Sequence, residues 1–271
     1  MWRSILVVSV LSAACSFEPA GTQPGELDAT VDTGPAIDAG PSVAPPQAYW
    51  SFDTDARDQV GPHHGTLIGT AQISAGASGY RGEALRLATE GDRVDVDLPS
   101  ALDFNRDFTW HLYVRTTDGS GALLSRNPAG RAWNQGSKAM FVRSDTVQWD
   151  SGWVSNPRTE VSIDDGTWHQ VIATYVAATD SLDVFVDPAV GAIAGQYSGT
   201  HDVNKYDEHT HLHNGGIADT GFSIGAANFT GGLSDLGTLI GAIDEVAVFD
   251  RALRGSELEL LVRSGPAAFA P

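Results

Sequence analysis

The sequence predicts an all-β protein in which two antiparallel sheets pack as a sandwich and one short helix follows near the C-terminus. Three observations lead to this fold class. Apolar and polar residues alternate along several short segments, clusters of turn-forming residues separate these segments, and a single late stretch has the periodicity of a helix.

Strand periodicity is clearest in DFTWHLYVRT, where every second residue from Phe108 to Val114 is apolar. RVDVDL and SLDVFVD alternate in the same way, whereas TWHQVIATYV is partly apolar on both faces and is therefore expected inside the sandwich. The turn formers TEGD, DDGT and AATD lie between such runs. This spacing predicts about a dozen strands in two antiparallel sheets, a sandwich or jelly roll.

The predicted helix is GSELELLVRSG. Ser256 and Glu259 have the spacing of a capping box, Leu258 and Leu261 lie on one face, and Gly265 ends the segment.

The first fifteen residues predict an export signal: one cation, a short apolar run, and small residues before Cys15. The run is much shorter than the ~20 residues that span a bilayer. Cys15 is the only cysteine, so no intramolecular disulfide forms. Its position resembles a bacterial lipobox, which implies a lipid-anchored protein of the cell envelope or outer membrane; simple secretion after cleavage remains the alternative.

Residues 16–46 carry acids, Pro, Gly and Ala and no Lys or Arg, so they predict a disordered linker. Residues 47–271 are expected to form one domain. The whole chain has 34 acidic against 16 basic residues and a net charge of −18, which excludes nucleic acid as a favoured partner. Acidic polysaccharide is also disfavoured unless a cation bridges it.

Taken in order, AYWSFD, HHGTLIG, GEALRLATEGDRVDVDLP, DFTWHLYVRT, DDGTWHQVIATY, SLDVFVD and GAIDEVAVFDRALRGSELELL are similar to laminin-G-like, concanavalin-A-like jelly-roll domains of bacterial surface proteins. The resemblance covers nearly all of residues 47–263. It implies two curved sheets whose concave face and rim loops bind glycans or proteins. Enzymes, lectins and adhesive modules share this architecture, so the resemblance leaves the function open.

Glycoside hydrolases on this fold need two carboxylates at a fixed separation. EGDRVD is the nearest match, but it ends in Asp95 and its first residues favour a turn. The motif therefore favours an acidic hairpin over a catalytic pair, and no other hydrolase motif is present.

Sugar binding depends on exposed aromatic rings with polar neighbours. Two polar, Gly-containing stretches supply such groups, and the predicted ligand-binding residues are Trp133, Asn134, Gln135, Trp149, Asp150 and Trp153. The alternative is that these rings only cover a sheet edge. Trp50, Trp110 and Trp168 lie in apolar strands and are expected in the core.

A structural calcium ion is implied by the resemblance, tying Asp53 near the first strand to Asp244 of the closing motif. An acidic turn and a capped strand are the alternative explanation for these carboxylates.

The stretch HDVNKYDEHTHLHNGG is predicted to be an inserted rim loop. In an extended chain His209, His211 and His213 share one side and suit zinc or a similar ion. Same-side residues stand ~7 Å apart, whereas ligands of one zinc ion lie ~3 to 3.5 Å from each other. The loop must therefore bend, or Asp207, Glu208 or His201 must replace one histidine, unless the stretch is simply a solvated loop.

These observations favour a cell-surface module that binds a glycan or protein ligand. A polysaccharide hydrolase or lyase and a structural envelope domain without a small ligand are the alternatives.

Overall fold

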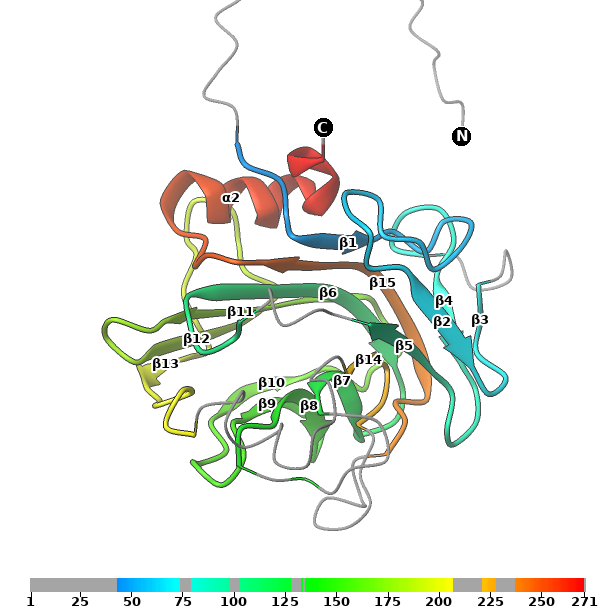
Figure 1. Cartoon of the computed structure of the whole chain (residues 1–271), viewed down its shortest axis with the longest axis horizontal. Helices are drawn as coiled ribbons and strands as arrows, with labels where there is room; N and C mark the ends of the chain where they lie inside the picture. Colours follow the sequence, from blue (N-terminus) through cyan, green and yellow to red (C-terminus); the bar gives the residue numbers. More distant parts are fainter. Residues whose placement is uncertain are drawn as a thin grey trace, which may run out of the picture. The chain divides into compact units, whose positions relative to one another are not determined.

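The computed structural model shows two antiparallel sheets stacked face to face, with a helix on the outer side of one of them (Figure 1). It describes residues 43–73, 79–97, 103–127, 133, 135–206, 221–227 and 237–270. This arrangement confirms the predicted all-β jelly-roll sandwich with one short C-terminal helix.

The helix-covered sheet, sheet A, is centred on β6 (Phe108–Thr116) and β15 (Gly241–Phe249). The first strand of the fold, β1 (Ala48–Trp50), pairs with β15, so early and late parts of the sequence lie side by side. The other strands of sheet A are β3 (Gln72–Ile73), β4 (Leu85–Leu87), β11 (His169–Val176), β12 (Ser181–Val186) and β13 (Tyr197–Thr200).

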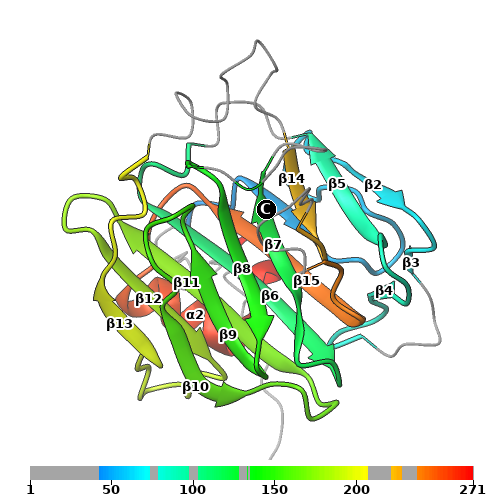
Figure 2. The same cartoon turned by 90° about the horizontal axis from the view of Figure 1, so that it is seen from below.

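Sheet B faces sheet A and lies in front of it in Figure 2, where α2 is seen behind both sheets. Its strands, in spatial order, are β10 (Arg158–Ser162), β9 (Thr146–Asp150), β8 (Lys138–Arg143), β7 (Ser120–Arg126), β14 (Gly221–Ile224), β5 (Arg93–Asp97) and β2 (Gly65–Ile68).

The core between the sheets is aromatic. Trp110 on β6 contacts Trp149 on β9 and Phe222 on β14, with ring centroids 4.9 and 5.5 Å apart. The predicted apolar face of β6 lies in this core, as do Leu182 and Val184 of β12. The period of two therefore identified the buried faces of these strands correctly.

Helix α2 (Gly255–Ser264) and the short 3-10 helix η2 (Pro266–Phe269) form a second apolar cluster on the outer face of sheet A. Leu258 and Leu261 of α2 pack in this cluster with Ile172 of β11 and Phe249 of β15. Strand β11 is consequently buried on both faces, as its two partly apolar faces predicted. No helix of the described residues is long and apolar enough to cross a membrane.

The start of α2 differs from the prediction. The N-cap is Arg254, without a side-chain hydrogen bond, and Ser256 lies inside the helix, so the predicted capping box does not form. Leu253 already packs in the cluster and sets where the helix begins. The predicted end is confirmed, since Gly265 has φ of 70° and its amide donates to the carbonyl of Leu261.

One buried carboxylate ties two turns of neighbouring strands. Asp92 is fully buried, and its oxygens accept the amides of Thr70, Ala88 and Thr89. Burial alone would raise the pKa of Asp92, but these hydrogen bonds hold it well below its ordinary value. Asp95, the last residue of EGDRVD, instead binds Arg93 and Ser223. Asp92 and Asp95, two of the three acids of this stretch, thus have structural partners.

We predict that Asp92→Asn lowers the free energy of unfolding by about 1–3 kcal/mol, because an amide nitrogen would face backbone donors. A carboxyl group with a lowered pKa contributes stability above its unfolded pKa and loses it as the pH falls. The difference between wild type and variant should therefore be largest above about pH 4 and shrink below it. Urea unfolding between pH 2 and 7 measures this.

The control for this experiment is Glu90→Gln, because Glu90 is exposed in the same turn. Equal unfolding midpoints for wild type and Asp92→Asn at pH 7 would contradict the role given to Asp92.

Candidate functional site

Trp153, in the segment between β9 and β10, is the most exposed large apolar side chain of the described residues, with 68% of its surface accessible. Its φ of 71° lies in the left-handed region, and the preceding Gly152 has φ of 52°. A bulky residue with this backbone conformation carries about 1–3 kcal/mol of strain, which persists only where surrounding contacts impose it.

Asp150 imposes this conformation. Its side chain is 5% exposed and accepts the backbone amides of Gly152 and Trp153, which turn back toward it. The amide nitrogen of Asn156 donates to Asp150 Oδ2 at 3.0 Å. Burial raises the pKa of Asp150 to about 6. Its Oδ1 is buried and has no hydrogen-bond partner in the part of the chain that the structure describes.

A second hydrogen-bond network holds the segment between β9 and β10 in place. Trp149 Nε1 donates to Ser151 Oγ at 2.6 Å, and His201 joins Ser151 to Ser155 through its two ring nitrogens at 3.2 and 2.9 Å. Burial lowers the pKa of His201 to about 4, so the ring is neutral near pH 7. The sequence allowed His201 as a substitute metal ligand, and in the structure both of its ring nitrogens are engaged by serines.

We refer to residues 150–156 as the Trp153 loop. It combines one exposed indole with a carboxylate, the Asn156 amide and a rigid base. The sequence predicted Trp153 and Asp150 but missed Asn156, Ser155 and His201. Gly152 is the sequence signal that could have indicated this loop, because a glycine directly before a tryptophan is typical of a tight turn that exposes the ring.

The position of Trp149 differs from the prediction that it binds a ligand. It is fully buried, with its ring centroid 5.4 Å from that of Phe108 and 4.9 Å from that of Trp110, so it cannot contact a ligand. The reason is the period of two on β9, where Val147 and Trp149 point inward and Gln148 and Asp150 outward.

Trp133 is also buried, at 8% exposure, and packs with Ala122, Ala139, Phe141 and Ala227 on the outer face of sheet B. This position matches the alternative in which the ring covers the sheet. Gln135 is half-buried, and Asn134 lies outside the described residues.

The remaining tryptophans were assigned to the core by the sequence. Trp50 and Trp110 are fully buried, as predicted. The assignment of Trp168 to the core is wrong, because this residue is half-buried just before β11. It lies beside Arg115, whose guanidinium is 5.0 Å from the ring centroid.

The two predicted calcium ligands lie close enough to interact. Asp244 is fully buried on β15 and accepts the amides of Arg81 and Glu245 at 3.0 and 2.9 Å. Burial first, and then the charges of Glu245 and the exposed Asp53, raise its pKa to about 8. Glu245 also has a raised pKa, through burial first, and accepts the Tyr49 hydroxyl at 3.0 Å.

These acids do not converge on a single point. In the described part of the chain, no three Asp, Glu, His or Cys side chains are placed to hold one ion. The site therefore offers at most a carboxylate pair, and further ligands would have to be backbone carbonyls. Burial is the largest cause of the raised pKa of Asp244, with the repulsion from Glu245 and Asp53 added to it, and a cation would offset both effects. The three candidate zinc ligands, His209, His211 and His213, lie outside the described residues.

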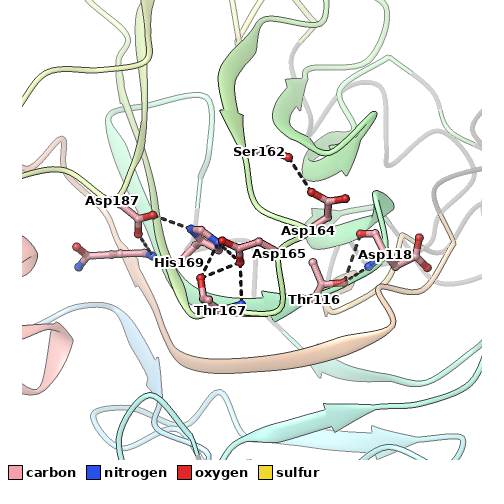
Figure 3. Close-up of polar contacts among 9 residues, drawn as sticks. Thr116, Asp118, Ser162, Asp164, Asp165, Thr167, His169 and Asp187 are labelled. Carbon is pink, nitrogen blue, oxygen red and sulfur yellow. Dashed lines mark hydrogen bonds and ion pairs between the residues drawn. The ribbon is translucent and has the colours of Figure 1, made fainter.

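A separate polar cluster surrounds His169 (Figure 3). Its Nδ1 lies 2.6 Å from Asp187 and its Nε2 lies 3.0 Å from Asp165, while the Thr167 hydroxyl donates to Asp165 at 2.7 Å. Burial alone would lower the pKa of His169, but the two carboxylates raise it. Both ring nitrogens face carboxylates and the Thr167 hydroxyl donates to Asp165, so the cluster ties a turn rather than activating a nucleophile.

Comparison with known proteins supports the fold alone. No family model matches the chain, and no curated protein matches its sequence. Domain 4 of AbnA, a GH43 extracellular arabinanase from Geobacillus stearothermophilus, in a structure with arabinotriose, is similar with a TM-score of 0.55 and 20% identity, over 82% of this chain and 100% of that one.

The binding domain of botulinum neurotoxin DC, in complex with rat synaptotagmin II, is similar with a TM-score of 0.52 and 11% identity. The similarity covers 81% of this chain and 51% of that one, about half of its length. At these identities the solved structures show a shared architecture, and the described body of this chain has the jelly-roll fold that its sequence motifs implied.

Proposed function

We propose that this jelly roll is a binding module that takes a neutral glycan on the Trp153 loop. The observation that carries the proposal is an exposed indole in a strained backbone conformation, held there by a buried carboxylate. Strain of this kind persists where an arrangement has a use beyond stability.

The chemistry of the loop suits a sugar. An indole face packs against the C–H face of a sugar ring, and the exposed Asn156 lies in the same short segment to meet hydroxyl groups, while the buried Asp150 carboxylate holds the turn. The network through Ser151, His201 and Ser155 fixes the loop before a ligand arrives, which reduces the entropy lost on binding. The arabinotriose in the structure of the arabinanase domain supports a neutral oligosaccharide as the first probe.

We predict that Trp153→Ala weakens binding of arabinotriose or another neutral oligosaccharide by about tenfold or more, because the stacking surface is lost. Trp153→Gly should weaken it equally while leaving the free energy of unfolding unchanged or higher. Glycine adopts φ of 71° without the strain that tryptophan bears there. A neutral glycan array followed by calorimetry and thermal unfolding measures both effects.

The matched control is Tyr80→Ala, since Tyr80 is also an exposed aromatic residue, stacked on Tyr113 of sheet A. Binding that survives both Trp153 substitutions would place the ligand elsewhere. Capture of proteins but no glycan would favour a protein receptor, and no ligand of either class would favour a structural envelope domain.

We also propose that calcium binds at Asp53 and Asp244, with backbone carbonyls completing its coordination. A buried carboxyl with a raised pKa costs stability once the pH exceeds its unfolded value, and the full cost is reached above the folded pKa of about 8. Calcium would remove this cost by favouring the charged form.

We predict that metal-free wild-type protein becomes less stable than Asp244→Asn as the pH rises from 4 to 8. Millimolar calcium should raise the melting temperature of the wild type and not that of the variant. Thermal unfolding with EDTA or calcium measures this, and Asp55→Asn, an exposed acid of the same loop, serves as the control. An equal response of wild type and Asp244→Asn to calcium would place the ion elsewhere or nowhere.

Finally, we propose that the protein is exported and anchored to the cell envelope by a lipid on Cys15. We predict that the mature protein partitions into the detergent phase and that Cys15→Ala moves it to the aqueous phase. A lipid chain buries many methylene groups and dominates the partition. Detergent phase separation followed by immunoblotting measures this, and identical partition of the two forms would contradict the anchor.

A further inference from the structure

Two arginines lie in register across one small residue on the outer face of sheet A. Ala242 of β15 pairs with Arg86 of β4 on one side and with Arg115 of β6 on the other. The residues beside them in these strands, such as Leu85, Val114 and Ile243, point into the core, so the two arginines share the opposite face. Neighbouring strands are ~4.8 Å apart, which places the arginine backbones ~10 Å apart with only a methyl group between them.

A hollow of about 340 Å³ occupies this position, at the lower end of the range of ligand pockets. Its lining includes both arginines, the threonines Thr116 and Thr117, and small residues at the base. A residue without a side chain is required at position 241, because a Cβ on Gly241 would lie 2.4 Å from the carbonyl oxygen of Arg115. The hollow is therefore lined by two arginines, by the small residues Gly241 and Ala242 between them, and by the exposed Thr117.

Neither arginine forms an ion pair with any residue that the structure describes. Arg86 is exposed, and Arg115 is half-buried with its guanidinium over the ring of Trp168. The acid nearest by register on the same face, Asp244, is directed to the amides of Arg81 and Glu245 instead.

The acids close to Thr116 also have partners on their own turns (Figure 3). Asp118 accepts the amide of Ser120, Asp164 accepts the Ser162 hydroxyl, and Asp165 binds Thr167 and His169. The guanidinium charges at the hollow are thus not offset by a direct carboxylate contact.

We infer that this hollow, the Arg86–Arg115 site, binds an oxyanion carried by a sugar residue, a uronate carboxylate or a sulfate ester. Guanidinium groups bind planar carboxylates and sulfate-like oxyanions through paired N–H donors. The volume suits one or two sugar rings rather than the broad face of a folded protein, and the exposed Thr117 hydroxyl supplies a further hydrogen bond. The Thr116 hydroxyl is buried and donates to the carbonyl of Ile240 instead.

The net charge of −18 opposes an anionic ligand at long range. At physiological ionic strength this field is screened over about 8 Å, so the contacts made within the hollow decide the affinity. The site lies on sheet A, whereas the Trp153 loop follows β9 of sheet B. The two sites therefore predict separate ligands or separate parts of one charged polysaccharide.

Calorimetry with trigalacturonate, a sulfated disaccharide, arabinotriose and a poly-glutamate peptide tests the inference. We expect at least one of the two anionic sugars to bind, and Arg86→Gln or Arg115→Gln to weaken its binding about tenfold or more. Arg115→Lys should also weaken it, because a lysine keeps the charge but lacks the paired donors. Arg57→Gln, which removes an exposed arginine outside the hollow, should leave the affinity unchanged.

Three results would overturn the inference: no binding of either anionic sugar to wild type, equal weakening by Arg57→Gln, or binding of poly-glutamate in preference to both sugars. Arg86 is exposed, so Arg86→Gln keeps the test decisive if Arg115→Gln destabilises the fold. Trp153→Ala should not affect the Arg86–Arg115 site. If the Trp153 loop binds no neutral glycan, the test of the Arg86–Arg115 site is unaffected. If the Arg86–Arg115 site binds no anionic sugar, the test of the Trp153 loop is likewise unaffected.

Discussion

Strand β15 is the element on which the rest of the structure depends. It pairs with β1, β4 and β6, it supplies Ile243, Val246 and Val248 to the core, and its outer face carries the α2 contact. A regular strand could not do this, because a strict period of two from Ile243 would turn Val246 and Val248 outward. A bulge between Asp244 and Ala247 adds the extra residue that keeps them inside.

The bulge has a local cost and a local use. Glu245 adopts φ of 53°, and its carbonyl oxygen accepts His111 Nδ1 at 2.9 Å within the buried layer under α2. Burial lowers the pKa of His111 to about 3, so the ring remains neutral there. The same irregularity places Asp244 and Glu245 side by side, which creates the acidic group. One extra residue thus organises features that are otherwise unrelated in the sequence.

The fold was predictable because its signals are local. Alternation in β6 and β12 identifies the buried faces directly, and an apolar pattern on both faces of β11 indicates a covered sheet. The helix start was not predictable, because packing of Leu253 outweighs the capping preference of Ser256. The Arg86–Arg115 site was also invisible in the sequence, since β4 and β6 become neighbours of β15 only through the sheet order.

The Trp153 loop also shows that sequence alone could not predict which side chains are exposed, here for residues close together in the chain. Trp149 and Trp153 stand four residues apart in similar polar surroundings, yet one is fully buried and the other largely exposed. The difference comes from the end of β9 at Asp150, after which two left-handed residues reverse the chain. Alternation assigns Trp149 to the core, but only the turn geometry shows that Trp153 leaves the sheet.

The pairing of β1 with β15 also has a consequence for how the chain folds. Gln47 and Asp250, which are hydrogen-bonded at this junction, are 203 positions apart in the sequence. Contacts at such separation form slowly, because a long loop must close before they contribute. During synthesis β1 has no partner until β15 has emerged, so the sandwich cannot close on a growing chain. Slow closure of this kind keeps the polypeptide unfolded for longer, which is the state that the export proposed above would require.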